Sequence, residues 1–413
     1  MIDHASRREF LSLVASGALT LAGRCADGEK LPPVRAVTKG PKHHWFGYYD
    51  KLQFDPTSRY LLGMEVDFEH RSPKPDDAIK VGVVDLQDND RWTELGSSKA
   101  WNWQQGCMLQ WLPGSKSEVI WNDRDGDRFV SHILDIQTKK QRTVPHPIYA
   151  LHPDGKSAIA CDFRRLNDTR PGYGYAGIVD PNKDKLAPED AGIWKVDLTT
   201  AKQTLLLAFA DAPKFPNAER DWKGAKHWYN HLLYSPDGAR FIFLHRWRGP
   251  QEKQGFGTRM FTAGGDGKDL YVVDPFGRTS HFIWRDPKAI LSWALHPSHG
   301  ERFYLYEDRT DKVEVIGKDV MTVNGHCTYL PGNQWILNDT YPDKERNQHP
   351  YLYHVATGKR HPLGHFRSPP EYAGEWRCDN HPRFSPDGKK VCIDSPHGGG
   401  RQMYVIDVAE IVG

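Results

Sequence analysis

The sequence predicts an all-β protein, a seven-bladed β-propeller, from three observations. A unit made of an apolar strand, a turn of the Ser-Pro-Asp-Gly type and a second apolar strand occurs seven times along the 413 residues. Most copies are followed by a third strand that ends in an Asp-centred turn. The chain also contains 37 Gly, 29 Pro and 14 Trp, which favours many short strands and tight turns over long helices. Repeats of roughly 40–50 residues with this make-up are typical of propeller blades.

The seven copies follow one another along the chain at uneven spacing. They are "KLQFDPTSRYLLGMEV", "MLQWLPGSKSEVIW", "IYALHPDGKSAIACDF", "HLLYSPDGARFIFLH", "WALHPSHGERFYLY", "CTYLPGNQWILND" and "HPRFSPDGKKVCIDS". An insertion, residues 170–192, precedes the fourth copy. The chain ends just after the third strand of the last copy, so we expect the segment around Arg35–Lys39 to supply the missing outer strand and close the ring.

The N-terminal segment has the pattern of a twin-arginine export signal. In "SRREFLSLVASGALTLAG", Arg7 and Arg8 precede Phe10, Leu11 and a short apolar run. The run is too short for a permanent transmembrane anchor. We therefore expect residues 1–30 to be removed on export, which leaves residues 31–413 as one propeller domain in the periplasm or outside the cell.

The charge balance excludes some partners. The chain has 55 basic and 53 acidic residues, a formal net charge of +2, which gives no electrostatic case for nucleic acid. The five cysteines after the signal are irregularly spaced and do not indicate a disulfide framework. We expect a monomer without a membrane span.

Histidines recur at one aligned position, four residues before the residue that precedes the turn proline. Copies four, six and seven carry His231, His326 and His381 there, and Cys378 lies three residues before the last of them. Because inner strands of a propeller start beside the axis, these side chains are expected to converge. Imidazole and thiolate are ligands of Zn²⁺ or a similar ion. The pattern predicts a structural metal site made of these four residues, with zinc first and manganese or calcium as alternatives; hydrogen-bonded histidines in a wet channel are the other interpretation.

A second polar group is expected on copies two to four. Tyr149 begins the inner strand of copy three, and we expect Arg165 to end the following strand at the same rim. Arg246 lies at the equivalent point of copy four, and copy two offers Gln105 and Asn122 as substrate-binding candidates. Together they suit an anionic ligand, although each arginine can instead pair with an aspartate and the tyrosine can cap a strand.

The segment "HHWFGYYD", residues 43–50, precedes the first inner strand and is dense in aromatic residues. Its His44 and Tyr48 are further candidates for substrate binding. The alternative is that the segment packs at the junction where the ring closes.

The motifs "CDNHPRFSPDG", "HHWFGYYD", "IYALHPDG" and "RPGYGY" on seven blades resemble the propeller polysaccharide lyases. These are the oligogalacturonate, ulvan and rhamnose–glucuronate lyases, which cleave next to a uronic acid by β-elimination. The resemblance implies Tyr149 as base or acid, Arg165 as the group that neutralises the carboxylate, and Arg246 as a second anion contact. It implies a uronate-containing oligo- or polysaccharide as substrate.

The same resemblance implies that the central histidines and Cys378 bind the metal. That metal takes part in catalysis in oligogalacturonate lyases and is structural in ulvan lyases, and the cysteine favours the second case. Two departures stand against lyase chemistry. Gln105 and Asn122 occupy places where the ulvan and rhamnose–glucuronate enzymes carry histidines, and neither takes a proton at neutral pH. Asp379 and Arg383 also stand near places where further His or Gln are expected.

Three hypotheses follow for the function. The first is an exported lyase that acts on a uronate glycan. The second is a propeller that binds glycan or protein without chemistry, which the missing histidines favour. The third is a glycoside hydrolase, for which no pair of carboxylates recommends itself.

Overall fold

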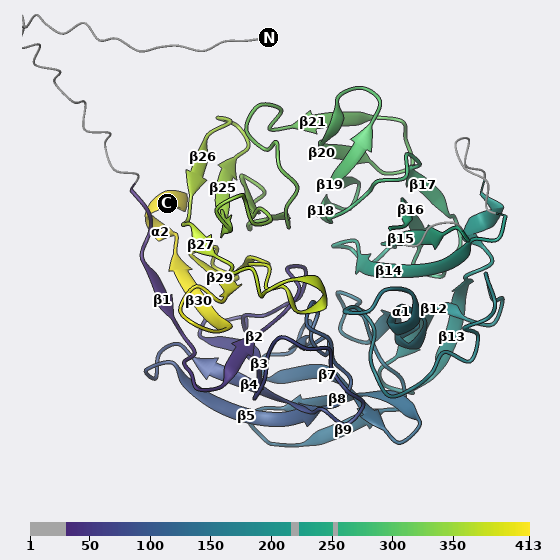
Figure 1. Cartoon of the computed structure of the whole chain (residues 1–413), viewed down its shortest axis with the longest axis horizontal. Helices are drawn as coiled ribbons and strands as arrows, with labels where there is room; N and C mark the ends of the chain where they lie inside the picture. Colours follow the sequence, from purple (N-terminus) through teal and green to yellow (C-terminus); the bar gives the residue numbers. More distant parts are fainter. Residues whose placement is uncertain (1–29, 216–222, 251–254) are drawn as a thin grey trace, which may run out of the picture. The chain divides into compact units, whose positions relative to one another are not determined.

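Seven four-stranded antiparallel sheets succeed one another in the computed structural model, which describes residues 30–215, 223–250 and 255–413. They surround a common axis in the unit that runs from Pro32 to Gly413 (Figure 1). The predicted all-β fold with seven blades is therefore confirmed. Residues 1–29 of the predicted export signal lie outside the described residues, so that signal stays a prediction. No helix in the described part of the chain is long and apolar enough to cross a membrane.

Each blade is one sheet that runs from an inner to an outer strand. Blades 1 to 4 contain β2 (His43–Trp45), β3 (Tyr60–Val66), β4 (Ile79–Asp85), β5 (Arg91–Ser98); β6 (Gln110–Trp111), β7 (Glu118–Asp125), β8 (Arg128–Asp135), β9 (Gln141–Val144); β10 (Ala150–Leu151), β11 (Ser157–Ala160), β12 (Gly192–Asp197), β13 (Gln203–Ala208); β14 (Lys226–Tyr234), β15 (Arg240–Arg248), β16 (Gly257–Gly264) and β17 (Tyr271–Asp274). Blades 5 to 7 contain β18 (Phe282–Asp286), β19 (Ala289–His296), β20 (Gly300–Glu307), β21 (Val313–Ile316); β22 (Thr328–Tyr329), β23 (Trp335–Asn338), β25 (Tyr351–His354), β26 (Arg360–Pro362); β28 (Arg383–Phe384), β29 (Lys390–Ser395), β30 (Gln402–Asp407) and β1 (Val34–Ala36).

A few elements lie outside the blades. Strands β24 (Asn347–Gln348) and β27 (Phe366–Arg367) form a two-stranded sheet. Helix α1 (Phe163–Thr169) follows β11, α2 (Ala409–Val412) ends the chain, and two 3₁₀ turns cover Ala212–Lys214 and Gly374–Trp376.

The ring closes as the sequence predicts. Strand β1 pairs antiparallel with β30, with Val34 opposite Ile406 and Ala36 opposite Tyr404. The seventh sheet thus combines both ends of the propeller unit, as Figure 1 shows in purple and yellow. Strand β30 gains hydrogen-bond partners on its outer side in this way, and the seventh sheet reaches four strands like the other six.

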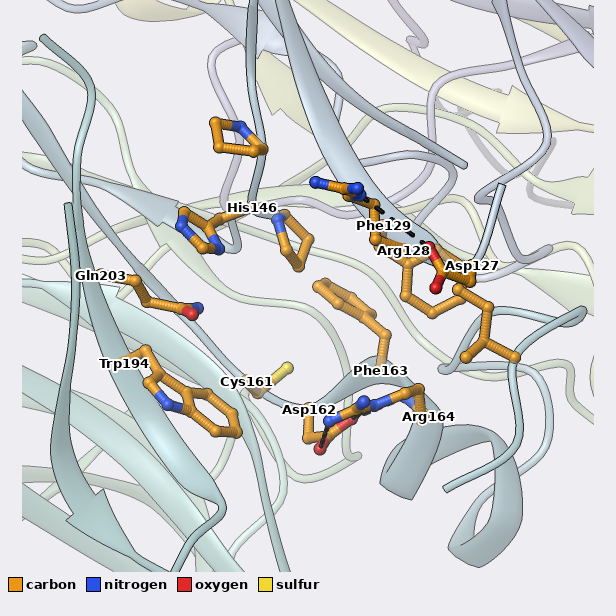
Figure 2. A pocket seen from close by; sticks show the side chains of 13 residues that line it. Asp127, Arg128, Phe129, His146, Cys161, Asp162, Phe163, Arg164, Trp194 and Gln203 are labelled. Carbon is orange, nitrogen blue, oxygen red and sulfur yellow. Dashed lines mark hydrogen bonds and ion pairs between the residues drawn. The ribbon is translucent and has the colours of Figure 1, made fainter. Parts of the chain in front are cut away.

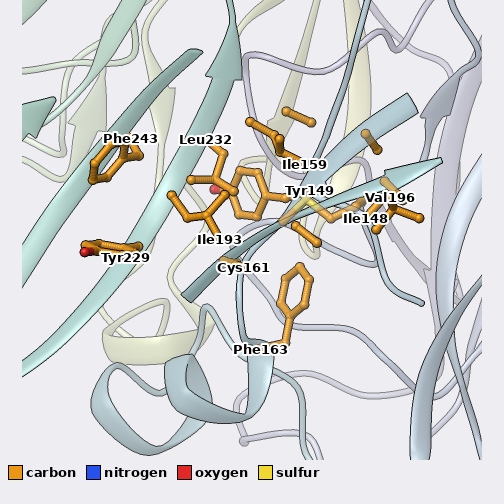
Figure 3. Packing of buried hydrophobic residues seen from close by; sticks show 14 of the residues in the cluster. Ile148, Tyr149, Ile159, Cys161, Phe163, Ile193, Val196, Tyr229, Leu232 and Phe243 are labelled. Atoms are coloured by element: carbon orange, nitrogen blue, oxygen red, sulfur yellow. The ribbon is translucent and has the colours of Figure 1, made fainter. Parts of the chain in front are cut away.

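The apolar core lies between neighbouring blades. Figure 3 shows part of the largest cluster, which joins blades 2, 3 and 4. Its members include Ile120 and Ile133 of blade 2, Ile159 and Val196 of blade 3, and Phe243 of blade 4. Because each sheet exposes apolar side chains on both faces, a single blade cannot bury them alone, and stacking around the ring does.

Blade 5 corrects the alignment of the repeats. Its inner strand is β18, which a tight turn at Pro287 and Lys288 joins to β19. The main-chain N–H groups of Lys288 and Ala289 donate to the Asp286 carboxylate, which stabilises this turn without a Ser-Pro-Asp-Gly motif. The "HPSHG" turn therefore joins the second and third strands. The residue that faces the axis just before the inner strand is His281 rather than Ser292.

Candidate functional site

Two of the aligned histidines reach the axis through unusual backbone geometry. His231 has a φ of +53° and lies where the register between β14 and β15 shifts. His381 has a φ of +42°. Such conformations cost free energy for residues with a side chain, and an extra residue in a strand redirects a side chain. Strain of this kind concentrates at functional sites.

Tyr149, His231 and Gln105 form one contact group beside the axis. The Nδ1 atom of His231 lies 3.4 Å from Tyr149 Oη and 3.3 Å from Gln105 Nε2, and Gln105 Nε2 donates to Tyr149 Oη at 2.7 Å. The three residues are 0%, 4% and 2% exposed for Tyr149, His231 and Gln105. Each comes from a different blade or its approach, so only the closed ring brings them together.

Asn122 positions the chain that leads into Tyr149. Its Oδ1 accepts from Ile148 N at 2.8 Å and its Nδ2 donates to Ile148 O at 2.7 Å. Ser131 and Tyr175 use the rest of its hydrogen-bonding capacity. Asn122 is buried and its amide spends both donors and both acceptor positions on the protein itself, so it serves as a positioning residue.

The two candidates in the segment 43–50, His44 and Tyr48, lie in different surroundings. Gly47 has a φ of +102°, and a Cβ there would lie 2.9 Å from the Gln105 main chain, so only glycine allows this close approach. It brings the Tyr48 ring onto His231 at a centroid distance of 4.9 Å. His44 instead contacts Glu65 and Gln402. The structure thus places Tyr48 in the central group and His44 outside it.

Burial sets the protonation of the central pair. The pKa of His231 lies well below its ordinary value because burial removes the hydration of the imidazolium, and the positive charges of Arg170 and Lys51 add to this effect. The pKa of Tyr149 lies well above its ordinary value because burial disfavours the phenolate, with the charge of Asp50 adding to it. At neutral pH His231 is therefore a neutral base and Tyr149 a protonated phenol.

The insertion and the segment before β28 meet over this pair. Tyr173 contacts the His231 ring edge-on at 5.5 Å and accepts a hydrogen bond from Arg377 Nη2 at 2.7 Å. Arg377 also donates from Nε to Asp379 Oδ2 at 2.7 Å. Arg170, at the start of the insertion, lies over the Tyr173 ring at 3.9 Å. Sequence reasoning missed these residues, since nothing in the repeats indicates where an insertion folds back.

Arg165 does not lie where the sequence suggests. The chain turns into α1 after β11, capped by the Asp162 carboxylate, which accepts from Arg164 N and Arg165 N. The Arg165 side chain is fully buried and donates to the carbonyl oxygens of His227, Asn182 and Leu186 and to Asp180. The expected pairing of Arg165 with Tyr149 at the rim is wrong, because this guanidinium ties the insertion to β14.

Arg246 is also buried, but its hydrogen bonding differs from that of Arg165. It is 3% exposed, and its Nε and Nη1 have no hydrogen-bond partner in the described part of the chain. Its guanidinium lies 4.7 Å from the Phe256 ring, and that of Arg170 lies 4.9 Å from the same ring. Buried cations of this kind call for an anion, so the two arginines form a candidate site for a carboxylate.

The two arginines should respond differently to substitution. Arg165→Gln is expected to lower the free energy of unfolding by about 3–5 kcal/mol, because it leaves the buried Asp180 carboxylate without its cation. Arg246→Gln is expected to stay within about 1 kcal/mol of the parent, because it removes a buried cation two of whose nitrogens have no hydrogen-bond partner in the described part of the chain. Denaturant unfolding measures both values. Equal losses would contradict the assignment of Arg165 as structural.

His326, Asp379 and His381 form a buried group whose ligand atoms lie within 4.8 Å of one another. Asp339 Oδ1 lies 2.9 Å from His326 Nδ1, which directs Nε2 toward the group as in metal sites. His381 Nε2 is buried, lies 3.9 Å from Asp379 Oδ2 and has no hydrogen-bond partner among the described residues. The His281 ring lies 4.1 Å from that of His326. The two imidazoles of His326 and His381 and the carboxylate of Asp379 are donors that fit a divalent metal ion.

This group differs from the predicted ligand set. It contains His326 and His381 but neither His231 nor Cys378. Residues two apart in an extended chain point the same way and neighbours point opposite ways. Asp379 and His381 are two residues apart in the segment before β28, but His381 has a φ of +42°, so strand alternation does not describe this segment and the structure alone identifies Asp379. Without the thiolate, the donors are imidazole and carboxylate, which manganese as well as zinc accepts, so the donor set indicates a divalent ion without selecting zinc.

The fold and the centre define a seven-bladed β-propeller with a histidine-rich axial site. The solved structures include an oligogalacturonate lyase in complex with manganese, with a TM-score of 0.65 and 17% identity over 91% of this chain and 93% of that one. An oligogalacturonate lyase from Vibrio parahaemolyticus has a TM-score of 0.65 and 16% identity over 91% and 94%. No protein-family model and no curated protein sequence matches the chain. At these identities the likeness establishes a common fold, and the resemblance to ulvan and rhamnose–glucuronate lyases stays a prediction.

Proposed function

We propose that the protein is a lyase that cleaves a uronic-acid-containing glycan by β-elimination. The observation that carries the proposal is the contact of neutral His231 with protonated Tyr149 beside three cations, Arg170, Lys51 and Arg377. A base and an acid in contact suit proton removal and leaving-group protonation. The cations suit the carboxylate of a uronate, and both solved structures named above are lyases of oligogalacturonate.

The residues divide the reaction as follows. Arg170 and Arg246 bind the uronate carboxylate and stabilise the negative charge that develops on it. His231 takes the proton from C5, the C4–C5 double bond forms, and the C4–O bond breaks. Tyr149 gives its proton to the leaving oxygen and regains one from His231. A divalent metal held by His326, Asp379 and His381 would supply further positive charge for the carboxylate.

Blade 2 carries Gln105 and Asn122 where the resemblance implies histidines, so it supplies no base. Gln105 cannot act as a base, but its Nε2 holds Tyr149 Oη and meets His231 Nδ1. The proton-accepting group is supplied by blade 4 instead. His231 and Tyr149 are buried and Tyr173, bonded to Arg377, lies against the His231 ring, so access of a sugar ring requires side chains around the pair to move.

The direct test is product formation from residues 31–413. The purified protein, loaded with Mn²⁺ or Zn²⁺, would be incubated with pectin fragments, ulvan and gum arabic, and absorbance followed near the unsaturated-uronate band. We expect a rise with at least one of them. No rise with any glycan, in folded and metal-loaded protein, would reject the lyase and leave the binding propeller as the function.

The rate should depend little on pH around neutrality. His231 must be unprotonated, and burial lowers its pKa from 6.5, so activity should persist as the pH falls below 6.5. Tyr149 must be protonated, and its pKa lies above 10.0, so activity should persist up to pH 10.0. A pH profile of kcat/KM checks this. Arg170→Gln should shift the acid limb to higher pH because a positive charge beside His231 is lost; a half-loss near pH 6.5 in the parent would contradict the assignment.

We also propose that the protein works outside the cytoplasm after twin-arginine export. Arg7→Lys combined with Arg8→Lys is expected to keep the chain in the cytoplasm, because that pathway requires the arginine pair. Cell fractionation of both forms measures the distribution. Equal amounts of parent and variant in the periplasm and medium would reject this route.

A further inference from the structure

A pocket of about 200 Å³ lies between blades 2 and 3 (Figure 2). Its walls come from the turn before β8, the segment after β9, the start of α1, and strands β12 and β13. The side chains that matter for binding are Arg128, His146, Phe163, Trp194 and Gln203. None of them belongs to the central group described above.

Several polar groups of this pocket have free hydrogen-bonding capacity. The Arg128 side chain is 61% exposed, and its nearest acidic atom is Asp127 Oδ1 at 3.9 Å. The Gln203 amide and the Trp194 indole N–H donate to nothing within the described ranges of the chain. Arg164, in contrast, is held by both oxygens of Asp162 at 2.9 and 2.8 Å. The available cation in this pocket is therefore Arg128.

The combination suits a single sugar ring. Sites for drug-sized ligands measure roughly 300–1,000 Å³, so a pocket of about 200 Å³ holds one ring rather than an oligosaccharide. The half-buried Trp194 offers an aromatic face for the C–H face of a pyranose. Gln203 and His146 can bond hydroxyl groups, and a guanidinium pairs well with a carboxylate.

We propose that this pocket binds one uronate residue of a glycan, with the sugar ring against Trp194 and the carboxylate on Arg128. The substrate class rests on the proposed function, but the pocket is separate from Tyr149 and His231. Phe163 lines the pocket, and its ring also lies 6.0 Å from the Tyr149 ring. A polymer held here is therefore kept beside the centre, which would raise its local concentration there.

Affinity electrophoresis of residues 31–413 tests the proposal. The gels contain polygalacturonate, ulvan or, as a neutral control, hydroxyethyl cellulose. Trp194→Ala and Arg128→Gln are each expected to weaken binding to the acidic polymer about tenfold. Trp335→Ala, a half-buried tryptophan of blade 6, and Arg91→Gln, an exposed arginine, are matched controls and should bind like the parent.

The outcomes separate this pocket from the lyase centre. Tyr149→Phe should keep the retardation of the parent, and Trp194→Ala should keep its kcat on short oligomers within twofold. No retardation by either acidic polymer, equal retardation by the neutral polymer, or parent-like binding of both pocket variants would overturn the proposal. Retardation that depends on Trp194 and Arg128 in a protein that forms no unsaturated product would support the pocket and reject the lyase. Arg128 lies at an exposed strand end, so its variant remains informative if Trp194→Ala fails to fold.

Discussion

Replacement of Tyr149 by phenylalanine is expected to lower kcat by about 10²–10⁴-fold, the range that general acid–base catalysis contributes. The substitution removes one hydroxyl group that contacts both Gln105 and His231 and leaves the ring that packs in the core (Figure 3). KM should change little, because the carboxylate contacts of Arg170 and Arg246 remain. Initial rates on the glycan that the parent cleaves provide the measurement.

His231→Gln should cause a loss of the same order, and the double variant should lose little more than either single one. Groups that move one proton between them act as a unit, so their effects do not add. His361→Gln, on the outer strand of blade 6, is a matched control that keeps the parent rate. Single variants within twofold of the parent would show that the chemistry lies elsewhere.

Loss of the metal site is the second large effect. His381→Ala is expected to weaken binding of Mn²⁺ or Zn²⁺ at least 100-fold, because it removes a ligand whose Nε2 makes no hydrogen bond to any described residue. Asp339→Asn should weaken binding about 10–100-fold, the usual effect of losing a carboxylate that orients a metal-binding histidine. Metal content after dialysis and calorimetric titration of the apoprotein measure both, independently of activity.

Cys378→Ser distinguishes the two ligand sets. From the structure we expect the variant to keep the metal affinity of the parent, because Cys378 lies outside the group of His326, Asp379 and His381. The sequence hypothesis expects a large loss, since a thiolate ligand would be replaced by a hydroxyl group. A loss comparable to that of His381→Ala would restore Cys378 as a ligand. Asp379→Asn completes the comparison, and we expect it to weaken binding.

The fold was predictable because a propeller repeats its local signals. Strand patterns, turns and the missing outer strand of the last copy are each readable over a few residues, and β1 pairs with β30 as expected. The alignment of blade 5 was wrong because it relied on the same turn motif. The first turn of this blade, at Pro287, lacks the motif, whereas the turn at 297–300 resembles it. The predicted inner strand was therefore the second strand of the blade, and His281 was not recognised as the aligned residue.

The sequence by itself determined the seven blades, the closure of the ring and the convergence of His326 and His381 on the axis, because each follows from a local pattern or a repeat. Only the tertiary structure determined which residues contact the candidate site residues. It placed His231 with Tyr149 and Gln105 through a bulge in β14, buried Arg165 under the insertion, and left two nitrogens of Arg246 without a hydrogen-bond partner among the described residues. Several of these contacts join residues far apart in the sequence: 126 positions from Gln105 to His231, 82 from Tyr149 to His231 and 62 from Arg165 to His227. Their geometry depends on insertions and bulges whose course is set by packing against neighbouring blades rather than by the residues in them.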